Sequence, residues 1–343
     1  MLTLCDQRVS VVIPSARAFP EDLVRSLEKQ LCYGDEIVVV QNRPLLGSRH
    51  WIGVPQHAPS PLDPKAAPQE PFATAGMGPT HFPITPHLTV VVSDEGAAAA
   101  RNRGWRVAQN DSILFLDDDV TIEEKFVSLV REYLANSPMA GAATFRIIDG
   151  EPTPWSLLIR ETISMDRGAT VRRTHGASVR LRDVWMYGAG AAMMVSRGLL
   201  EETGGFKEDL GAGRRNGGTE DMEFLWHASR HAEVEYVGHI AVAHASAAGL
   251  PIVARKLREY GRAIGNLGGT TRDIDGFQYA INYCWHILHA TFTRNIGLPA
   301  LSRFRIRVEA IRAVVETLVV YVSSAARVQL IRSLCDECRR GTP

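Results

Sequence analysis

Two runs of β-branched residues near the N-terminus restrict the fold of this chain more than any other feature. Residues 9–13 read VSVVI, residues 36–40 read EIVVV, and a helical apolar pattern lies between them from Leu23 to Leu31. Short apolar runs of this kind are typical of strands buried in a parallel sheet. The pattern predicts a βαβ unit, and folds built from such units bind ligands at the carboxyl ends of their strands.

Further strand and helix patterns continue to about residue 247. We expect strands at residues 88–93, 113–116, 142–148, 189–196 and 235–244, and an alanine-rich helix at residues 96–109. Past residue 248 the chain reads as helical. The sequence therefore predicts an α/β domain over residues 1–247, with a mostly parallel central sheet flanked by helices, and a helical C-terminal region over residues 248–343.

One segment interrupts this order. Ten of the 18 prolines lie between residues 44 and 86, in a stretch without apolar periodicity. Such a composition does not support packed helices or strands. We predict that residues 44–87 form a proline-rich insertion in the α/β domain.

The overall composition excludes some partners. With 343 residues and 45% hydrophobic content, the chain can bury a sizeable core. Lys and Arg total 38, as do Asp and Glu, so no bulk positive field exists to attract nucleic acid. The five cysteines are odd in number and scattered, and no signal peptide is recognisable, which favours a reducing cytoplasm. Cys335 and Cys338 form one CxxC without a second ligand pair, a weak signal for zinc.

The strand predicted at residues 113–116 runs directly into three aspartates, in the sequence ILFLDDDV. Two carboxylates about 4 Å apart repel by roughly 4 kcal/mol at an effective dielectric constant near 20, which favours a bound cation. Asp117 and Asp119 point to the same face of an extended chain. An acidic turn after a strand is the simpler alternative. Because Mg²⁺ and Mn²⁺ take oxygen ligands and substrate phosphate, the cluster suggests a metal-assisted phosphate site.

A glycine-rich loop and an acidic helix start lie further along. Residues 207–218 read KEDLGAGRRNGG, and Thr219 is expected to cap a helix with Glu220 and Asp221 in its first turn. The macrodipole keeps a carboxylate ionised there, so Asp221 is either a general base or a structural anion. The last strand ends on His244, and a histidine in that position is commonly a hydrogen-bonded structural residue.

The helical C-terminal region offers two patterns. Arg255, Arg258 and Arg262 are spaced along one helix face, and a solvated face explains them better than a phosphate clamp. Apolar residues also recur in steps of three and four, at Phe304, Val308, Ile311, Val315, Leu318, Val322 and Ala325. This heptad pattern fits either a helix packed on the main domain or the seam of a homodimer.

No window of the sequence offers the roughly 18 uncharged apolar residues of a membrane-spanning helix. The best candidate, residues 313–326, is 14 residues long and contains Glu316. We therefore expect no transmembrane span and a cytoplasmic protein, with peripheral membrane contact as an open alternative.

Four motifs now stand in order: VSVVIPS, GAAAARNRGWRVAQNDSILFLDDD, GGFKEDLGAGRRNGGTEDMEF, and a strand ending in VAH. Together, over about residues 9–247, they resemble the non-processive, inverting family-2 glycosyltransferases of the GT-A nucleotide-sugar-binding fold. The resemblance implies transfer of one sugar from a nucleotide-diphosphate sugar to an acceptor hydroxyl or other nucleophile. It also implies a divalent cation, Mn²⁺ or Mg²⁺, as cofactor.

The resemblance assigns the reacting centre to particular residues. Asp117 and Asp119 match the outer aspartates of the metal-binding DxD motif, and His244 matches a histidine that completes the metal shell in some relatives. Asp221 matches the catalytic base, and Glu220 beside it matches an acceptor-contacting or orienting residue. A base on one face and a leaving group on the other imply inversion at the anomeric carbon.

The resemblance also assigns the donor and loop residues. Pro14 and Ser15 match the strand end that cradles the nucleotide, and Arg101 matches an arginine near the base or phosphates. Asp118 is expected to share the work of donor binding. The loop that contains Gly217 and Gly218 is expected to lie across the donor on the acceptor side.

The sequence departs from the family pattern at the end of the second strand. Relatives carry an aspartate there that contacts the base, whereas this chain has Gln41 and Asn42. Amides both donate and accept hydrogen bonds, so these residues can still contact a base. The resemblance favours a UDP-sugar as donor, and this departure leaves the identity of the base open. The chain also lacks the QxxRW motif of processive relatives.

Two functions of other classes compete with sugar transfer. A nucleotidyltransferase could use the carboxylates on a nucleoside triphosphate, although no basic glycine-rich signature follows the first strand. The other alternative is a non-catalytic nucleotide-sugar-binding protein, or a partner subunit that uses the C-terminal heptads. The sugar, the acceptor and the linkage have no interpretable signature.

Overall fold

The structure is a computed structural model of the chain. It describes residues 7–16, 19–42, 87–93, 96–136, 141–162, 166–174, 179–211, 214, 217–245, 249–271, 273–293 and 297–340. Side chains at residues 159–162, 332 and 334–340 are outside this description. Residues 43–86, which carry nearly all of the proline-rich insertion predicted at residues 44–87, lie outside the described residues, and so do the side chains of the CxxC.

The described part of the chain contains the predicted strands in order, together with β5 and β7, which were not predicted. The strands are β1 (Val9–Ser15), β2 (Glu36–Asn42), β3 (His87–Ser93), β4 (Ser112–Leu116), β5 (Val120–Thr121), β6 (Ala142–Asp149), β7 (Val171–Thr174), β8 (Ala192–Ser196) and β9 (Val234–His244). The helices that alternate with them are α1 (Glu21–Glu28), α2 (Ala97–Val107), α3 (Phe126–Asn136), α4 (Pro154–Thr162), the 3₁₀ helix η2 (Leu181–Tyr187), α5 (Arg197–Thr203) and α6 (Glu220–Ala228).

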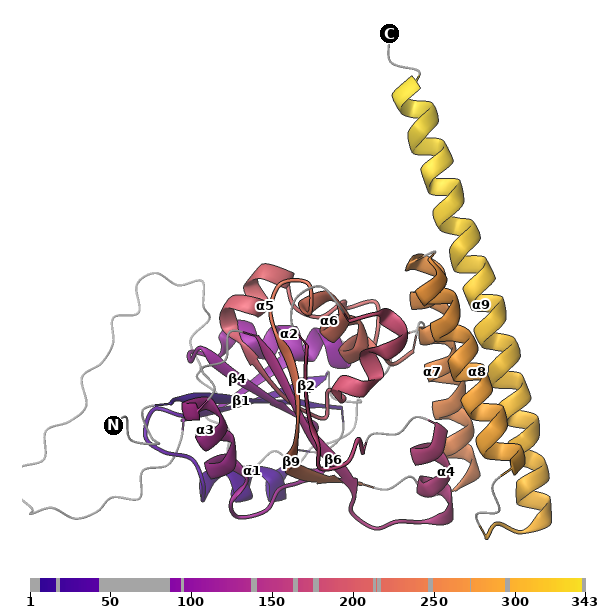
Figure 1. The fold of residues 1–343 in the computed structure, drawn as a ribbon. Helices are drawn as coiled ribbons and strands as arrows, with labels where there is room; N and C mark the ends of the chain where they lie inside the picture. Colours follow the sequence, from indigo (N-terminus) through magenta and orange to yellow (C-terminus); the bar gives the residue numbers. More distant parts are fainter. Residues whose placement is uncertain are drawn as a thin grey trace, which may run out of the picture. The chain divides into compact units, whose positions relative to one another are not determined.

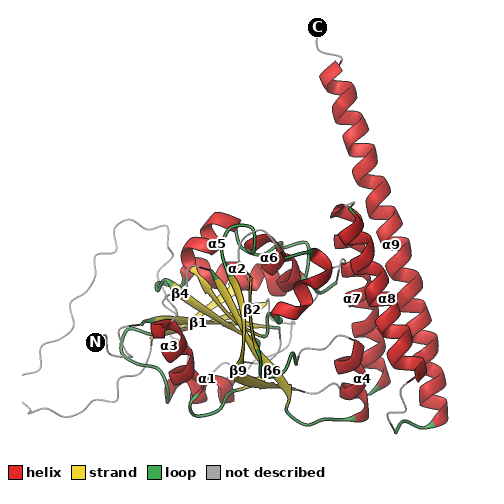
Figure 2. Ribbon diagram, viewed as in Figure 1, coloured by secondary structure: helices red, strands yellow, loops and turns green. Residues whose placement is uncertain are grey.

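These strands form one mixed sheet in the order β3-β2-β1-β4-β8-β6-β9-β5, with β7 paired to β9. The block β3-β2-β1-β4 is parallel, whereas β8 runs antiparallel to both of its neighbours. Helices α1 and α3 lie on one face of the sheet, and α2, α5 and α6 lie on the other (Figure 2). The expected α/β class with flanking helices is confirmed, and the parallel arrangement holds for the first block of strands.

Parallel pairing brings several predicted site residues to one edge of the sheet. Ser15 at the end of β1 pairs with Gln41 of β2, and β1 pairs in parallel with β4, which ends just before Asp117. Residues that follow parallel strands meet at the same sheet edge. The βαβ unit thus positions the nucleotide-side residues as the sequence predicts.

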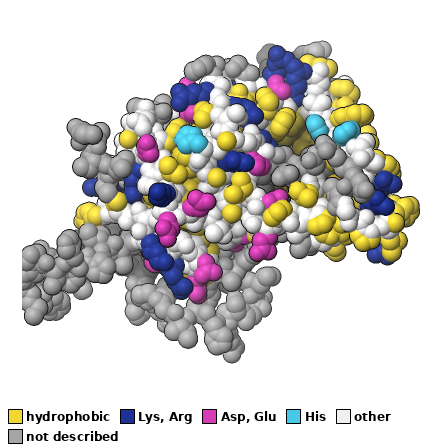
Figure 3. Space-filling model, turned by 60° about the horizontal axis from the view of Figure 1, so that its bottom comes forward, with side chains coloured by type: hydrophobic (Ala, Val, Ile, Leu, Met, Phe, Trp, Pro, Cys, Tyr) yellow, Lys and Arg dark blue, Asp and Glu magenta, His cyan; other side chains and the backbone are white. Residues whose placement is uncertain are grey.

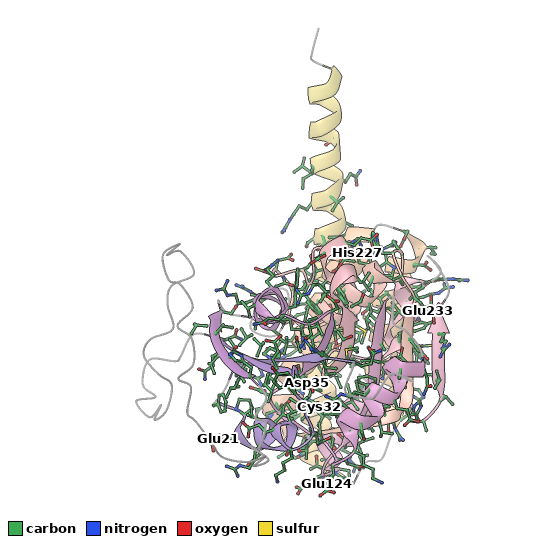
Figure 4. The ribbon with its side chains drawn as sticks, turned by 90° about the vertical axis from the view of Figure 1, so that its left-hand side faces the viewer. Glu21, Cys32, Asp35, Glu124, His227 and Glu233 are labelled. Atoms are coloured by element: carbon green, nitrogen blue, oxygen red, sulfur yellow. The ribbon has the colours of Figure 1, made fainter. Side chains whose placement is uncertain are left out.

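Asp35 anchors the start of β2 to β1. Its carboxylate accepts hydrogen bonds from the backbone N–H groups of Val9 at 2.9 Å and Cys32 at 2.6 Å, and it forms a buried ion pair with Arg131. Figure 4 shows Cys32 and Asp35 close together in this turn. Cys32 is disulfide-bonded.

Three long helices follow the sheet: α7 (Leu250–Thr271), α8 (Ile274–Thr293) and α9 (Ala300–Arg340). They lie side by side, with α9 packed mainly on α7, and α8 also contacts α4 and η2 (Figure 1). The described residues of the sheet and of these helices belong to one compact unit. The predicted helical C-terminal region is therefore present and packs on the α/β part.

Glycines allow α7 and α9 to approach closely. A Cβ added to Gly265 would lie 2.4 Å from the carbonyl oxygen of Thr317, and one added to Gly269 would lie 2.4 Å from that of Tyr321. A Cβ added to Gly261 would lie 2.5 Å from the hydroxyl oxygen of Thr317. A side chain at any of these positions would separate the helices, so small residues form the packing face.

The heptad residues of α9 are not this packing face. Phe304, Ile311, Val315, Leu318 and Val322 are exposed. Helix α9 packs on the main domain, as one alternative expected, but it does so through the side that faces the glycines of α7, and most heptad residues lie on its exposed side.

Helix α9 also bears on the expectation that no segment spans a membrane. Residues Ala300–Ile331 are long and apolar enough to cross a membrane by length and composition, with a mean hydropathy of 1.4 in their best window, of which 11% is buried. The expectation that no segment spans a membrane required a window without any charged residue. Helix α9 does not meet that condition, because it carries charged residues among its apolar ones.

Candidate active site

The three aspartates form a turn at the centre of the sheet edge. Strand β4 ends at Leu116, and the backbone N–H of Asp117 donates to the carbonyl of Ala191 at 3.1 Å. The short strand β5 then pairs with the end of β9, with Val120 opposite His244. The fold therefore brings the last residue of β9 beside the acidic turn.

Asp117, Asp119 and His244 could hold a metal ion. One ligand atom from each lies within 4.8 Å of the other two, and Nε2 of His244 is 3.1 Å from Oδ1 of Asp119. Burial lowers the pKa of His244, but the hydrogen bond and charge of Asp119 outweigh this effect, and the pKa is raised.

The imidazole of His244 faces an oxygen atom on each side, because its Nδ1 also lies 2.9 Å from the carbonyl of Ala245. Both a protonated ring and a metal-bound ring satisfy this arrangement. Two carboxylates and one imidazole form a donor set that suits Mn²⁺ and Mg²⁺, so the residues fit the predicted ion.

A buried arginine joins the two halves of the site. Arg101 of α2 donates to Asp117 at 2.8 Å and to Glu220 at 2.6 Å, and it lies 5.5 Å from the ring centroid of Phe206. Burial alone would lower its pKa, but the charges of Asp117, Glu220 and Asp221 outweigh burial and raise it. Arg101 is 2% exposed, so in this structure its guanidinium contacts protein carboxylates at both ends.

Asp221 lies on the other side of Arg101. Its Oδ2 accepts a hydrogen bond of 2.7 Å from the backbone N–H of Gly190, and its Oδ1 accepts one of 2.8 Å from Met222. A Cβ added to Gly190 would lie 2.8 Å from Cβ of Asp221 and 3.2 Å from Nη2 of Arg101. Only glycine fits between the predicted base and the arginine that contacts the metal group.

Glu220 is the most buried acid of the site. Burial raises its pKa, while the guanidinium of Arg101 opposes that rise. A carboxylate in this position orients the arginine and is screened from solvent, at 7% exposure. The structure therefore places Glu220 against Arg101, with Asp221 as its neighbour on the helix.

The glycine-rich loop reaches helix α6 by an unusual backbone turn. Thr219 precedes α6 with a φ of 105°, and its side chain makes no capping hydrogen bond, so the predicted cap is wrong. Gly217, with a φ of 76°, packs against the backbone of Glu259, and Gly218 lies near the ring of Tyr260. Both glycines thus pack on α7.

The predicted donor residues surround the ends of β1 and β2. Asp118 accepts hydrogen bonds from the hydroxyl of Ser15 at 3.0 Å and from the backbone N–H of Ala16 at 3.2 Å, which ties the acidic turn to β1. Pro14 is the penultimate residue of β1, and Gln41 and Asn42 end β2. These residues lie along one edge.

Three groups near Asp221 were not predicted. Burial raises the pKa of Tyr260 of α7 and of Tyr279 of α8, and the negative charge of Asp221 raises both further. Burial also lowers the pKa of Arg167 to about 10, and its Nη1 has no hydrogen-bond partner among the described residues. No local sequence signal marks these residues, because the three-dimensional packing alone brings them to α6.

Comparison with known families defines the class. Residues 81–204 match the family model described as glycosyl transferase family 2. The matched segment contains Arg101 and the three aspartates, and the match supports a glycosyltransferase. The resemblance stated from the sequence motifs is thereby confirmed. No protein of curated function matches the chain.

Solved structures with similarity to the chain include glycosyltransferases. The crystal structure of residues 1–349 of S. aureus TarS has 13% sequence identity and a TM-score of 0.43, over 94% of this chain and 91% of that one. The mannosyltransferase PcManGT from Pyrobaculum calidifontis, in complex with GDP-Man and Mn²⁺, has 16% identity and a TM-score of 0.49, over 94% of this chain and 87% of that one. TarS residues 1–349 in complex with UDP-GlcNAc have 13% identity and a TM-score of 0.45, over 94% of this chain and 92% of that one.

Proposed function

We propose that this glycosyltransferase moves one sugar from a nucleotide-diphosphate donor to an acceptor hydroxyl or other nucleophile, with inversion at the anomeric carbon. The observation that carries the proposal is the bridge of Arg101 between Asp117 of the metal group and Glu220, the neighbour of Asp221. Two carboxylate clusters with different tasks thereby share one site.

Asp221 is the proposed general base. A carboxylate in the first turn of a helix is favoured in its charged form, and each of its oxygens retains a lone pair beyond the one bonded to a backbone N–H. Removal of the acceptor proton by a positioned carboxylate contributes on the order of 10²- to 10⁴-fold in rate. The hydrogen bond from Gly190 holds this carboxylate in a fixed direction.

Asp117, Asp119 and His244 are the proposed ligands of the divalent cation. Such an ion, when bound, supplies Lewis-acid stabilisation of the charge that develops on the leaving diphosphate. Asp118 acts on the protein side by fixing the end of β1, which we propose as the cradle of the nucleotide together with Gln41 and Asn42.

The test uses the purified full chain and a panel of UDP- and GDP-sugars with Mn²⁺, and measures release of nucleoside diphosphate. The variant Asp221→Asn should retain the Mn²⁺-dependent rise in melting temperature that nucleotide produces, and should lose turnover by about 10²- to 10⁴-fold. Asp111→Asn, which removes an acid that is 98% exposed, is the matched control and should keep both.

Three results would contradict the proposal. Normal turnover in Asp221→Asn excludes this residue as the base. Release of pyrophosphate from a nucleoside triphosphate indicates a nucleotidyltransferase instead. Binding of nucleotide sugars without any release of diphosphate, with or without candidate acceptors, indicates a non-catalytic binder.

A further inference from the structure

Helices α8 and α9 expose a broad set of apolar side chains. We name this set the apolar strip: Phe277, Ile281, Trp285 and Phe292 of α8, and Leu301, Phe304, Ile311, Val315, Leu318, Val319 and Val322 of α9. Several of its side chains are highly exposed, including Trp285 at 64%, Phe304 at 65% and Val322 at 64%. Contiguous exposed apolar surface of this kind marks an interaction site.

The two helices present the strip as one surface. The rings of Phe277 on α8 and Tyr321 on α9 lie 6.0 Å apart. Towards the other end of the pair, Arg307 of α9 lies 5.0 Å from the ring centroid of Phe292 and donates to the carbonyl of Thr291 at 3.3 Å. Because contacts join the helices at both positions, their exposed apolar residues lie along a shared seam.

The strip cannot turn inward. The opposite side of α9 contacts the glycines of α7 backbone to backbone, and Ala310 and Ala313 are fully buried there. A rotation of α9 would bring valine or phenylalanine side chains against those glycines, where even one added carbon would collide. The exposure of the strip is therefore built into the helix packing.

The charges beside the strip are mainly positive. Arg305, Arg312 and Arg327 are exposed on α9, and Arg312 also forms an ion pair with Glu309 at 2.7 Å. The acids Glu309 and Glu316 of the same helix form ion pairs with Arg258 and Arg262 of α7, at 3.3 and 3.2 Å. Among the described side chains of α9, arginines thus outnumber acids beside the apolar residues, and each of the two acids is paired with an arginine of α7.

Helix α8 adds no opposing charge to the strip. Its one acid, Asp275, lies 3.6 Å from Arg182 of η2, and the exposed Asp273 just before the helix accepts a hydrogen bond from the backbone N–H of Gly276. Figure 3 shows hydrophobic side chains interleaved with Lys and Arg along the side where the C-terminal helices lie. An apolar surface with a positive border matches an anionic, apolar partner.

We propose that the apolar strip binds the surface of a lipid bilayer that contains anionic headgroups. Apolar residues with flanking arginines are typical of helices that lie in the membrane interface, and Trp285 suits the headgroup level. The arginine border gives affinity for negative lipid, and the apolar side chains enter the boundary of the acyl region.

Charge decides against the other occupants. In a symmetric dimer the strip would face its own copy, and the flanking arginines would meet arginines. A spanning α9 would carry the ion pairs of Glu309 and Glu316 with α7 into hydrocarbon, where charged groups are costly. An interfacial position avoids both penalties, because only one side of the helix pair contacts lipid.

Vesicle flotation of the full chain tests this proposal. The protein should float with vesicles of phosphatidylcholine and phosphatidylglycerol, float much less with phosphatidylcholine alone, and be released as salt is raised. The variant Arg305→Gln/Arg312→Gln/Arg327→Gln should bind about 100-fold more weakly, since each arginine near the surface contributes about 5-fold. Arg25→Gln/Lys29→Gln/Lys125→Gln removes the same charge from other exposed sites and should bind normally.

A second variant tests the apolar contribution. Val315→Gln/Val319→Gln/Val322→Gln changes exposed positions only and should weaken binding by at least about 10-fold without loss of helical circular dichroism. Brominated acyl chains should quench part of the tryptophan fluorescence, and Trp285→Phe should remove that quenching, whereas Trp185→Phe should not.

Four outcomes would overturn the proposal. These are no flotation with anionic vesicles, flotation that ignores both salt and the arginine variant, quenching that survives Trp285→Phe, and a stable dimer that the valine variant dissociates. The last outcome would assign the strip to a second copy. None of these measurements depends on turnover, so the proposal stands or falls separately from the proposed function.

Discussion

The contacts of Arg101 predict a stability loss whose size depends on pH. The variant Arg101→Met keeps most of the side-chain volume and removes the guanidinium that contacts Asp117 and Glu220 at 2.8 and 2.6 Å. The two acids then differ in their access to water. The side chain of Asp117 is 29% exposed and can be hydrated, whereas that of Glu220 is 9% exposed and cannot.

The unpaired, buried charge of Glu220 accounts for most of the expected loss in free energy of unfolding. Removal of one partner from a buried ion pair costs about 3–5 kcal/mol, because the other charge is left without compensation. Loss of a hydrogen bond to a solvated carboxylate costs about 1 kcal/mol or less. We therefore expect Arg101→Met to lower the free energy of unfolding by about 3–5 kcal/mol near pH 8.

The sign of the pH dependence follows from Glu220. Burial already raises its pKa, and the variant removes the guanidinium that opposes this rise. An acid whose folded pKa lies above its unfolded value holds its proton longer when folded, so stability is highest at low pH and falls as pH rises towards the folded pKa. The deficit of Arg101→Met relative to the unchanged chain should therefore shrink between pH 8 and pH 5, by up to about 1.4 kcal/mol per pH unit.

Urea denaturation followed by circular dichroism at pH 5 and pH 8 measures this effect. The double variant Arg101→Met/Glu220→Gln is the matched control, since a neutral amide replaces the stranded charge. It should recover most of the loss at pH 8 and show little pH dependence. Equal losses for the single and double variants, or a deficit that grows at pH 5, would refute an uncompensated Glu220 as the cause of the instability.

Two further predictions test the helix packing and the metal group. Gly265→Ala should destabilise the fold, because the added Cβ overlaps the carbonyl of Thr317; the expected cost in free energy of unfolding is about 1–3 kcal/mol, less a helix-propensity gain of up to about 1 kcal/mol. The melting temperature should therefore fall, whereas Gly198→Ala, with open space around its Cβ, should raise it. A change of the same sign in both variants would contradict the close packing of α7 and α9. His244→Gln should remove most of the rise in melting temperature that Mn²⁺ produces, and the exposed His239→Gln should not; an unchanged rise in His244→Gln would exclude it as a ligand.

The sheet was predictable because its signals are local. The apolar runs that become β1, β2 and β4 identify buried strands by residue type alone, and parallel pairing then fixes which ends share an edge. The position of the aspartates at the end of β4 follows directly. The antiparallel β8 was not distinguishable from a parallel strand, because a buried strand is apolar in either direction.

The contacts within the site were less accessible to sequence reasoning. Arg101 and Glu220 are far apart in the sequence, and nothing in either neighbourhood indicates that they pair. Thr219 has the residue type of a helix cap, but its left-handed backbone prevents the capping hydrogen bond. Arg167 and Tyr260 carry no local signal, because their proximity to Asp221 depends on how α7 and α6 pack.

The heptad of α9 shows a different limit. Apolar residues in steps of three and four mark one face of a helix, but they do not say what that face contacts. The informative residues were the glycines at positions 261, 265 and 269 on α7, which permit a close helix contact through small residues. Once that contact is known, the apolar face has to point away from it.

The contacts of Arg101 with two carboxylates have a consequence for the binding of the proposed donor and cation. Asp117 is already oriented by a guanidinium, and the carboxylate of Asp221 is oriented by Gly190, so both halves of the centre are preorganised by folding. Little rearrangement entropy then remains to oppose ligand capture. Under the proposed function, binding of ion and donor should therefore leave the positions of Asp117 and Asp221 almost unchanged.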